Sequence, residues 1–236
     1  MTFERELYDE AYYATLHPRH WFKSPARKFE ERDRDVLRLI EPAARDRVLE
    51  LGCARGDVTF LLARHAGEVI GVDAADEALA MAEAERKRRG LLNVRFVKAD
   101  VADLAPIADA SVDAVAAIDL VEHVDDPTLR AMLAECRRVL VPGGRLGIYT
   151  PERAHYVERM KAHDFLIKQF PQHIAVRRAR EYAAVLREAG FSVELSTYSV
   201  SPFPLVRFVE RALAPLPLVG PTFRYRALLR ARKPVS

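Results

Sequence analysis

The sequence has only two cysteines, Cys53 and Cys136, among its 236 residues. Two cysteines cannot form the multi-bridge framework of a small secreted domain, and no spacing typical of a structural metal site occurs. No apolar run approaches the roughly 20 residues that a membrane-spanning helix needs. Three of the first six residues are charged, which is not typical of a signal peptide. We therefore expect a cytoplasmic protein in reduced surroundings, with no bound metal.

An excess of charge of one sign is also missing. There are 37 basic and 34 acidic residues, so the formal net charge is +3. The short basic clusters at 86–89 and 177–180 fall in segments with helical periodicity. They are interpreted as solvated helix faces rather than as a patch for RNA or DNA, and no nucleic-acid partner is expected.

What the sequence does contain is an alternation of strand-length apolar runs with amphipathic helical windows between residues 34 and 150. This alternation predicts a doubly wound, mostly parallel α/β sheet that is covered on both faces. Asp76 is the expected N-cap of one helix, and Gly90 is its expected end. The predicted strands are Val48–Leu51, Val69–Val72, Val94–Val97, Ala114–Ile118 and Leu146–Tyr149, and the predicted helices are Asp57–Ala66, Asp76–Arg89 and Pro127–Leu140.

The chain is expected to form one domain over residues 1–236, with an N-terminal arm or lid at 1–33, a core at 34–150 and a substrate-side region at 151–236. In the last region, Ala179–Ala189 is predicted to be a helix and Phe191–Ser199 a strand. Phe223–Arg232 is predicted to form a final strand near a sheet edge. Between them, residues 202–221 are apolar and rich in proline, which disfavours a long regular helix.

Three interpretations of Phe203–Val219 remain open at this stage. The segment could form a wall of an apolar substrate pocket, a dimer surface, or a peripheral membrane contact with Arg207 and Arg211 at its polar edge. The oligomeric state does not follow from the sequence.

The first predicted strand leads into a glycine-containing turn, Gly52–Gly56, and the second ends at Asp73. In a doubly wound sheet, ligands bind beyond the carboxyl ends of the strands at the topological switch point. Glycine allows a sharp turn and a close approach of the backbone to a ligand. A carboxylate at Asp73 can accept hydrogen bonds from the two hydroxyls of an adenosine ribose. These residues therefore predict an adenosine-bearing ligand.

The turn itself argues against a nicotinamide dinucleotide. The dinucleotide fingerprint places glycine at the second position and leaves a helix N-terminus open to pyrophosphate. This sequence has Ala54 at that position and Asp57 near the helix start. A carboxylate there repels a phosphate, whereas Glu50 and Asp57 suit a ligand with a cationic sulfonium.

Five segments in order resemble the motifs of class I S-adenosylmethionine (SAM)-dependent methyltransferases, over roughly residues 45–150. Val48–Gly56 is similar to the first motif of that family, and Val69–Asp73 to the strand that ends in the ribose-binding acid. The other three matching segments are Phe96–Val101, Val112–Val124 with its Glu-His-Val ending, and Arg137–Leu146 with its Pro-Gly-Gly turn. The Tyr8–Phe29 arm and the Glu-His-Val ending most resemble ubiquinone-biosynthesis-like small-molecule O-methyltransferases.

This resemblance implies a seven-stranded Rossmann-like sheet with an antiparallel last strand, and SAM as cofactor with S-adenosylhomocysteine as product. Ala54 departs from the usual glycine; its methyl group fits if φ is negative, and we expect a slightly displaced cofactor rather than lost binding. The cofactor-binding residues expected from the motifs are Arg27, Glu50, Gly52, Ala54, Gly56, Asp73, Ala74, Asp100, Val101, Ile118 and Asp119.

His123 is the candidate catalytic residue. The resemblance places it beyond the fourth strand, and imidazole is the side chain best suited to accept a proton near pH 7. A second interpretation, that it only shapes the loop or positions the substrate, stays open. His155, His163 and His173 could line the pocket, and His17 and His20 belong to the possible lid.

The expected reaction is methyl transfer from SAM to a hydroxyl of a small, rather apolar molecule. The alternatives are an N- or C-methyltransferase of a small molecule or lipid, a nicotinamide-dependent oxidoreductase, and a non-enzymatic SAM-binding protein. The sequence does not identify the acceptor.

Overall fold

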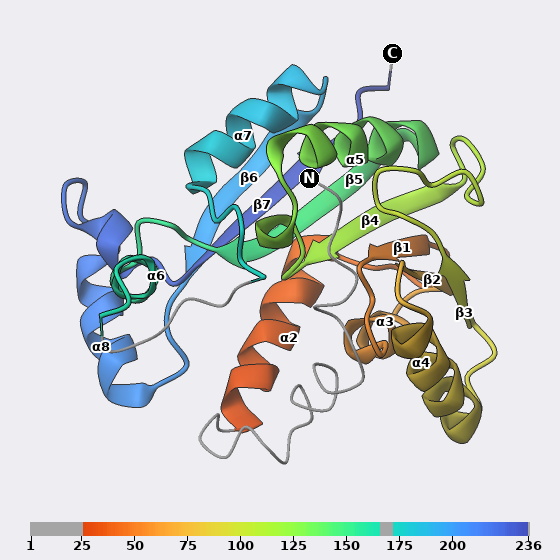
Figure 1. Ribbon diagram of the computed structural model, residues 1–236, viewed down its shortest axis with the longest axis horizontal. Coiled ribbons are helices and arrows are strands. Elements are labelled where there is room, and N and C mark those ends of the chain that lie inside the picture. Colours follow the sequence, from red (N-terminus) through yellow and green to blue (C-terminus); the bar gives the residue numbers. More distant parts are fainter. Residues whose placement is uncertain (1–25, 166–171, 236) are drawn as a thin grey trace.

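The computed structural model describes residues 26–165 and 172–235 (Figure 1). Its seven strands form a single sheet in the order β3-β2-β1-β4-β5-β7-β6. They are β1 (Arg47–Leu51), β2 (Glu68–Asp73), β3 (Val94–Lys98), β4 (Val112–Ile118), β5 (Leu140–Pro151), β6 (Ser192–Ser199) and β7 (Arg226–Arg232).

The first five strands are parallel, and β7 runs antiparallel to both β5 and β6. The predicted doubly wound sheet with an antiparallel last strand is therefore confirmed. The final strand lies one position inside the edge, because β6 occupies the edge itself. Since β7 is antiparallel, its first residue, Arg226, pairs with Pro151 at the carboxyl end of β5.

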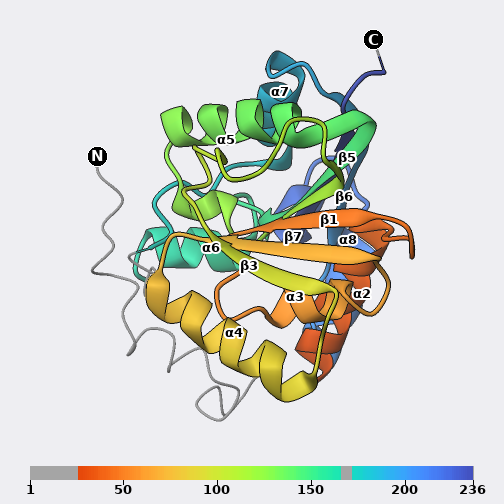
Figure 2. The ribbon, with the colours of Figure 1, turned by 90° about the vertical axis from the view of Figure 1, so that its right-hand side faces the viewer.

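Two layers of helices cover the sheet, as Figure 2 shows. Helices α2 (Ala26–Ile40), α3 (Asp57–Leu62) and α4 (Asp76–Arg89) lie on one face, and α5 (Asp126–Val139) and α7 (Ala179–Glu188) lie on the other. Successive residues of a strand point to opposite faces of the sheet: Val48 packs with α2 and α3, whereas Leu49 packs with α5 and α7. Burial on both faces explains why the strands are almost continuously apolar.

Local signals set most helix ends. Gly90 ends α4 in the left-handed conformation, as predicted. Asp125 caps α5, its carboxylate accepting from the Thr128 amide at 3.0 Å. The expected cap at Asp76 is off by one residue: Ala75 is the N-cap, and the Asp76 carboxylate pairs instead with Lys98.

The N-terminal boundary expected at residue 33 falls inside a continuous helix, α2. Val36, Leu39 and Ile40 of this helix are fully buried against the sheet. The side chain of Arg27 and the whole segment 1–25, with His17, His20 and the expected lid, lie outside the described residues.

The C-terminal third adds α6 (Tyr156–Ala162), α8 (Pro204–Leu213) and two 3₁₀ turns, η2 (Val121–His123) and η3 (Gly220–Phe223). The proline-rich segment does form a helix, α8, but one of only ten residues. Pro204 lies in its first turn, where the missing amide costs nothing. No helix within 26–165 and 172–235 is both long enough and apolar enough to cross a bilayer.

Candidate cofactor and acceptor site

The carboxyl ends of β1, β2 and β4 form the crevice in which the sequence places the ligand. From β1 the chain adds β2 and β3 on one side of the sheet and then crosses to add β4 and β5 on the other side of β1. This is the topological switch point at which doubly wound sheets bind ligands. The loops that follow these strands begin at Gly52, Ala74 and Asp119, which places three of the predicted site residues at one edge.

The turn after β1 is built from three residues with positive φ: Gly52 at 64°, Ala54 at 46° and Gly56 at 88°. At Gly52, an added Cβ would come within 2.8 Å of the Leu120 side chain. Glycine is favoured there because its φ lies in the left-handed region, and the loop after β4 packs against the same turn. Figure 1 shows β1 and β4 side by side at this point.

Ala54 does not have the negative φ that its methyl group was expected to require. Its φ of 46° lies in the left-handed region, where an L-residue with a Cβ is strained by about 1–2 kcal/mol. The cause lies in the adjacent strand, because the Ala54 amide donates to Oδ2 of Asp73 at 2.9 Å and this hydrogen bond holds the turn in place.

Replacing Ala54 with glycine should therefore stabilise the protein, by about 0.5–1 kcal/mol after the flexibility of glycine is subtracted. Urea unfolding measures the gain. Ala110 is a matched control, since it has a φ of 44° in an exposed loop away from the crevice. Ala110→Gly should give a similar gain in stability without altering affinity for S-adenosylhomocysteine. A loss of stability in Ala54→Gly would contradict the strain at this position.

Asp73 joins the two loops that border the crevice. Its Oδ2 accepts from Ala54 and its Oδ1 accepts from Ala75, both at 2.9 Å. Burial raises the pKa of Asp73, and hydrogen bonds from the backbone amides of Ala75, Ala54 and Ala74 oppose that rise. A carboxylate oxygen has two acceptor sites, so each oxygen retains capacity for a ribose hydroxyl.

Glu50 was expected to place a second carboxylate near the cofactor's cation. The structure instead buries it beneath α3, with 3% of its surface exposed, where it accepts a hydrogen bond from the Thr59 hydroxyl. Burial raises the pKa of Glu50 to about 8, which favours its protonated form at pH 7. Its expected role near the cofactor's cation stays a prediction.

Asp100 and Val101 follow β3 at the same edge as Asp73. Asp100 is exposed, and its Oδ1 accepts from the Ala102 amide at 2.9 Å. Ile118 is the buried last residue of β4, 6% exposed. Asp73 at the end of β2 and Asp100 after β3 can accept hydrogen bonds from the ribose hydroxyls and the adenine edge of an adenosine. These carboxylates therefore fit the expected cofactor.

On the β4 side, Asp119 makes an ion pair that the sequence did not predict. Its carboxylate lies 3.0 Å from the guanidinium of Arg226, the first residue of β7. The Arg226 guanidinium also lies over the rings of Tyr149 and Tyr225. Asp119 therefore belongs to the wall of the crevice, with its charge balanced by Arg226.

Beside this ion pair lies His123, at the end of η2. Its Nδ1 is 3.0 Å from the carbonyl oxygen of Gln172. Because a carbonyl can only accept, Nδ1 carries the proton, and in the neutral ring the lone pair is on Nε2. Burial lowers the pKa of His123, so the ring is neutral at pH 7.

His173 packs edge-on against His123, with ring centroids 5.0 Å apart. Burial, followed by the neighbouring His123, lowers the pKa of His173 to about 3. Glu122 is 1% exposed and accepts from the Thr150 hydroxyl at 3.0 Å; burial and the nearby Asp119 raise its pKa. The site thus contains two neutral imidazoles and a carboxyl group that favours its protonated form.

Glu122, His123 and His173 are the one group of three metal-ligating side chains found within the described residues, with donor atoms inside 4.8 Å of one another. Binding of a divalent cation there would require a deprotonated Glu122, although burial favours the protonated form of this side chain. His123 would need to coordinate through Nε2, since Nδ1 donates to Gln172.

The other candidate histidines have different roles. His155 is fully buried, and its Nε2 lies 3.0 Å from the carboxylate of Glu210 on α8. His163 is exposed at the end of α6. His155 is therefore structural, linking the loop after β5 to α8.

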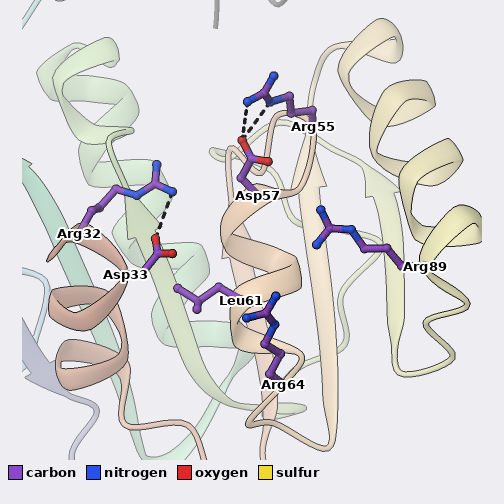
Figure 3. Close-up of a pocket in the computed structure, with 7 residues that line it drawn as sticks. All are labelled: Arg32, Asp33, Arg55, Asp57, Leu61, Arg64 and Arg89. Atoms are coloured by element: carbon purple, nitrogen blue, oxygen red, sulfur yellow. Dashed lines mark hydrogen bonds and ion pairs between the residues drawn. The ribbon is translucent and has the colours of Figure 1, made fainter. Parts of the chain in front are cut away.

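Figure 3 shows a separate hollow of about 260 Å³ along the outer surface of α3, between α2 and α4. Two of its arginines are paired with carboxylates, Arg55 with Asp57 at 2.8 Å and Arg32 with Asp33 at 3.3 Å. It extends along α3 to Arg64, away from the strand ends, and contains neither Asp73 nor Asp119.

Known proteins resemble this chain in sequence and in fold. A family model described as a methyltransferase domain matches residues 48–144. The ubiquinone biosynthesis O-methyltransferase of Xylella fastidiosa (strain 9a5c) is 31% identical over 166 residues, covering 68% of this chain and 66% of that protein. The chain belongs to the class I SAM-dependent methyltransferases. SAM is the methyl donor of this family, and the crevice of Asp73 and Asp100 is where this methyltransferase would hold it.

Solved structures show that the methyltransferase fold is widely shared. The geranyl diphosphate C-methyltransferase of Streptomyces coelicolor A3(2) has a TM-score of 0.67 at 18% identity, covering 92% of this chain and 86% of that one. The [4+2]-cyclase SpnF has a TM-score of 0.67 at 23% identity, covering 88% and 81%. At such identities the likeness establishes the fold alone, and the curated relative above is matched over just under two thirds of its length.

Two residues of the candidate site were not predicted from the sequence. Arg226 is 107 positions after Asp119, and nothing in an alternating apolar-basic strand distinguishes it from Arg230 or Arg232. His173 was considered only as one of several histidines. Neither residue carries a local signal, since both reach the site through the packing of the C-terminal third.

Proposed function

We propose that this methyltransferase transfers the methyl group of SAM to a hydroxyl of a small, rather apolar molecule, with His123 as the general base. The observation that carries the proposal is the state of His123: a neutral imidazole beyond β4 whose Nδ1–H is fixed on the Gln172 carbonyl. A hydroxyl needs to lose its proton as the new bond forms, and a neutral imidazole near the crevice can accept it.

The atoms balance without a further reactant. The bond between sulfur and the methyl carbon breaks, a bond between the acceptor oxygen and that carbon forms, and the acceptor proton moves to Nε2 of His123. SAM supplies an already activated methyl group, so the protein contributes alignment, exclusion of water and proton removal.

The residues around His123 support this role. Glu122 favours its protonated form, and although the charge of Asp119 acts to raise the pKa of His123, burial outweighs it and the pKa stays below its ordinary value. The base therefore remains deprotonated at neutral pH until the acceptor provides the proton. The name of the Xylella fastidiosa relative, an O-methyltransferase, favours oxygen over carbon or nitrogen as the acceptor atom.

Methyl-labelled SAM tests the proposal with three matched acceptors: an alkyl-substituted catechol, its bis-methyl ether and the corresponding aniline. Label is expected on a catechol oxygen, with none on the ether. Label on carbon or nitrogen, or no transfer from a chain that binds S-adenosylhomocysteine by calorimetry, would overturn it. If the chain binds a nicotinamide dinucleotide and not S-adenosylhomocysteine, the result would support the oxidoreductase alternative instead.

A further inference from the structure

The segment between β6 and β7 builds a surface that the methyl-transfer reaction does not use. β6 ends at Ser199 and β7 begins at Arg226, and these two residues pair with each other. Because Arg226 also pairs with the end of β5, the inserted helix α8 and turn η3 leave the sheet at the same end as the crevice. Figure 1 shows α8 beside α6, beyond this end of the sheet.

The inner face of α8 is firmly held. Glu210, 1% exposed, accepts from the Tyr156 hydroxyl at 3.0 Å and also lies 3.0 Å from Nε2 of His155. Arg207 forms an ion pair with Glu31 of α2. These contacts fix which face of α8 points outward.

The outer face is apolar and exposed. Leu205, Phe208 and Leu218 expose 87%, 79% and 95% of their surfaces, and Val209 and Leu216 are also exposed. Positions 205, 208 and 209 have the i, i+3, i+4 spacing of one helix face. An apolar hollow of about 460 Å³ on α6 adjoins the same region through Tyr156, which is bonded to Glu210. Large apolar side chains exposed together on one helix face mark an interaction site.

The charge around this face points to an anionic partner. From Pro204 to Phe223, the sequence has two basic residues, Arg207 and Arg211, and one acid, Glu210, which is buried. Arg211 is exposed at the edge of the apolar face, and no carboxylate pairs with it among the residues that the structure describes. An exposed arginine at the border of an apolar face suits an anionic surface, where the guanidinium can pair with headgroups while the apolar side chains are buried.

We propose that α8 and the following residues to Val219 dock the protein on an anionic lipid bilayer, with Leu205 and Phe208 inserted among the acyl chains and Arg211 at the headgroups. Short helices with an apolar face and arginine at its border bind membranes in this way. The inference does not depend on the identity of the methyl acceptor, and it selects the membrane from the three interpretations that the sequence left open for 203–219.

Flotation with phosphatidylcholine vesicles, with and without phosphatidylglycerol, tests this surface. The full chain should bind the anionic vesicles, and less so at high salt. The double substitution Leu205→Ser, Phe208→Ser should lower the partition coefficient about tenfold or more, since two large apolar side chains no longer insert. Arg211→Gln should lower it roughly fivefold on anionic vesicles only.

Leu92→Ser is the matched control. Leu92 is 95% exposed in the connection between α4 and β3, at the opposite edge of the sheet, so its loss should leave vesicle binding unchanged. All variants should keep the melting temperature and the affinity for S-adenosylhomocysteine, since the substituted side chains face solvent. Absence of binding to anionic vesicles, or equal binding by the double variant, would refute membrane docking. Sedimentation of the wild-type chain as a dimer that the double variant dissociates would assign the face to self-association instead.

Discussion

His123→Ala is expected to lower kcat by about 100- to 10,000-fold while affinity for S-adenosylhomocysteine stays nearly constant, because general-base catalysis contributes that much to a rate. Steady-state turnover with the best catechol acceptor and calorimetry with S-adenosylhomocysteine measure the two quantities. A large loss of cofactor affinity would instead make the histidine structural.

His123→Asn separates the base from the scaffold. The asparagine amide can donate to the Gln172 carbonyl as Nδ1–H does, but it cannot accept a proton at neutral pH. It should therefore be as inactive as the alanine variant, and recovery of activity in it would show that only the hydrogen bond matters. His163→Ala, at an exposed position at the end of α6, is the control and should keep full turnover.

The pH profile follows from the same side chain. Burial lowers the pKa of His123 below its usual 6.5, and a base works only when deprotonated. kcat/KM should therefore rise with pH through a pKa below 6.5 and be level at pH 7. The rising limb should disappear in His123→Ala; its persistence would assign the titration to another group.

Asp73→Ala should weaken S-adenosylhomocysteine binding by roughly 1.5–3 kcal/mol, the value of hydrogen bonds to a charged group. The substitution removes the acceptor for the ribose hydroxyls. It also leaves the amides of Ala54 and Ala75 without their present partner, so the turn after β1 should become less ordered. Isothermal titration calorimetry measures the affinity.

Asp113→Ala is the control for Asp73. Asp113 lies at the start of β4, at the opposite end of the sheet, and likewise accepts a backbone hydrogen bond, from the Arg47 amide at 2.8 Å. Both variants lose a carboxylate that accepts from a backbone amide, but only Asp73→Ala should lose cofactor affinity. Equal affinity in Asp73→Ala and the wild-type chain would refute the ribose assignment.

The sheet and the position of the cofactor crevice were predictable because they depend on local patterns. Parallel strands buried on both faces are continuously apolar, and their carboxyl ends meet at one edge, so Gly52, Asp73 and Asp119 had to converge once the strands were recognised. Helix boundaries were less accurate: α3 ends at Leu62 rather than Ala66, where turns replace the predicted continuation.

The protonation states were not predictable from residue type. Glu50 and Asp73 are both acids at strand ends and burial raises the pKa of both, but Glu50 lies beneath α3, whereas Asp73 accepts backbone amides that oppose the rise. The difference depends on which face of the sheet each side chain enters and on what covers it.

The sequence by itself determined the class of fold and the methyl donor, and it predicted the adenosine end of the site, because the motifs for each consist of residues close together along the chain. Only the tertiary structure decided the left-handed Ala54, the Asp119–Arg226 ion pair, the contact of His123 with His173 and the outward face of α8. Each of these depends on β7 entering the sheet antiparallel beside β5 or on contacts between distant loops, and such long-range packing leaves no periodic signal in the chain.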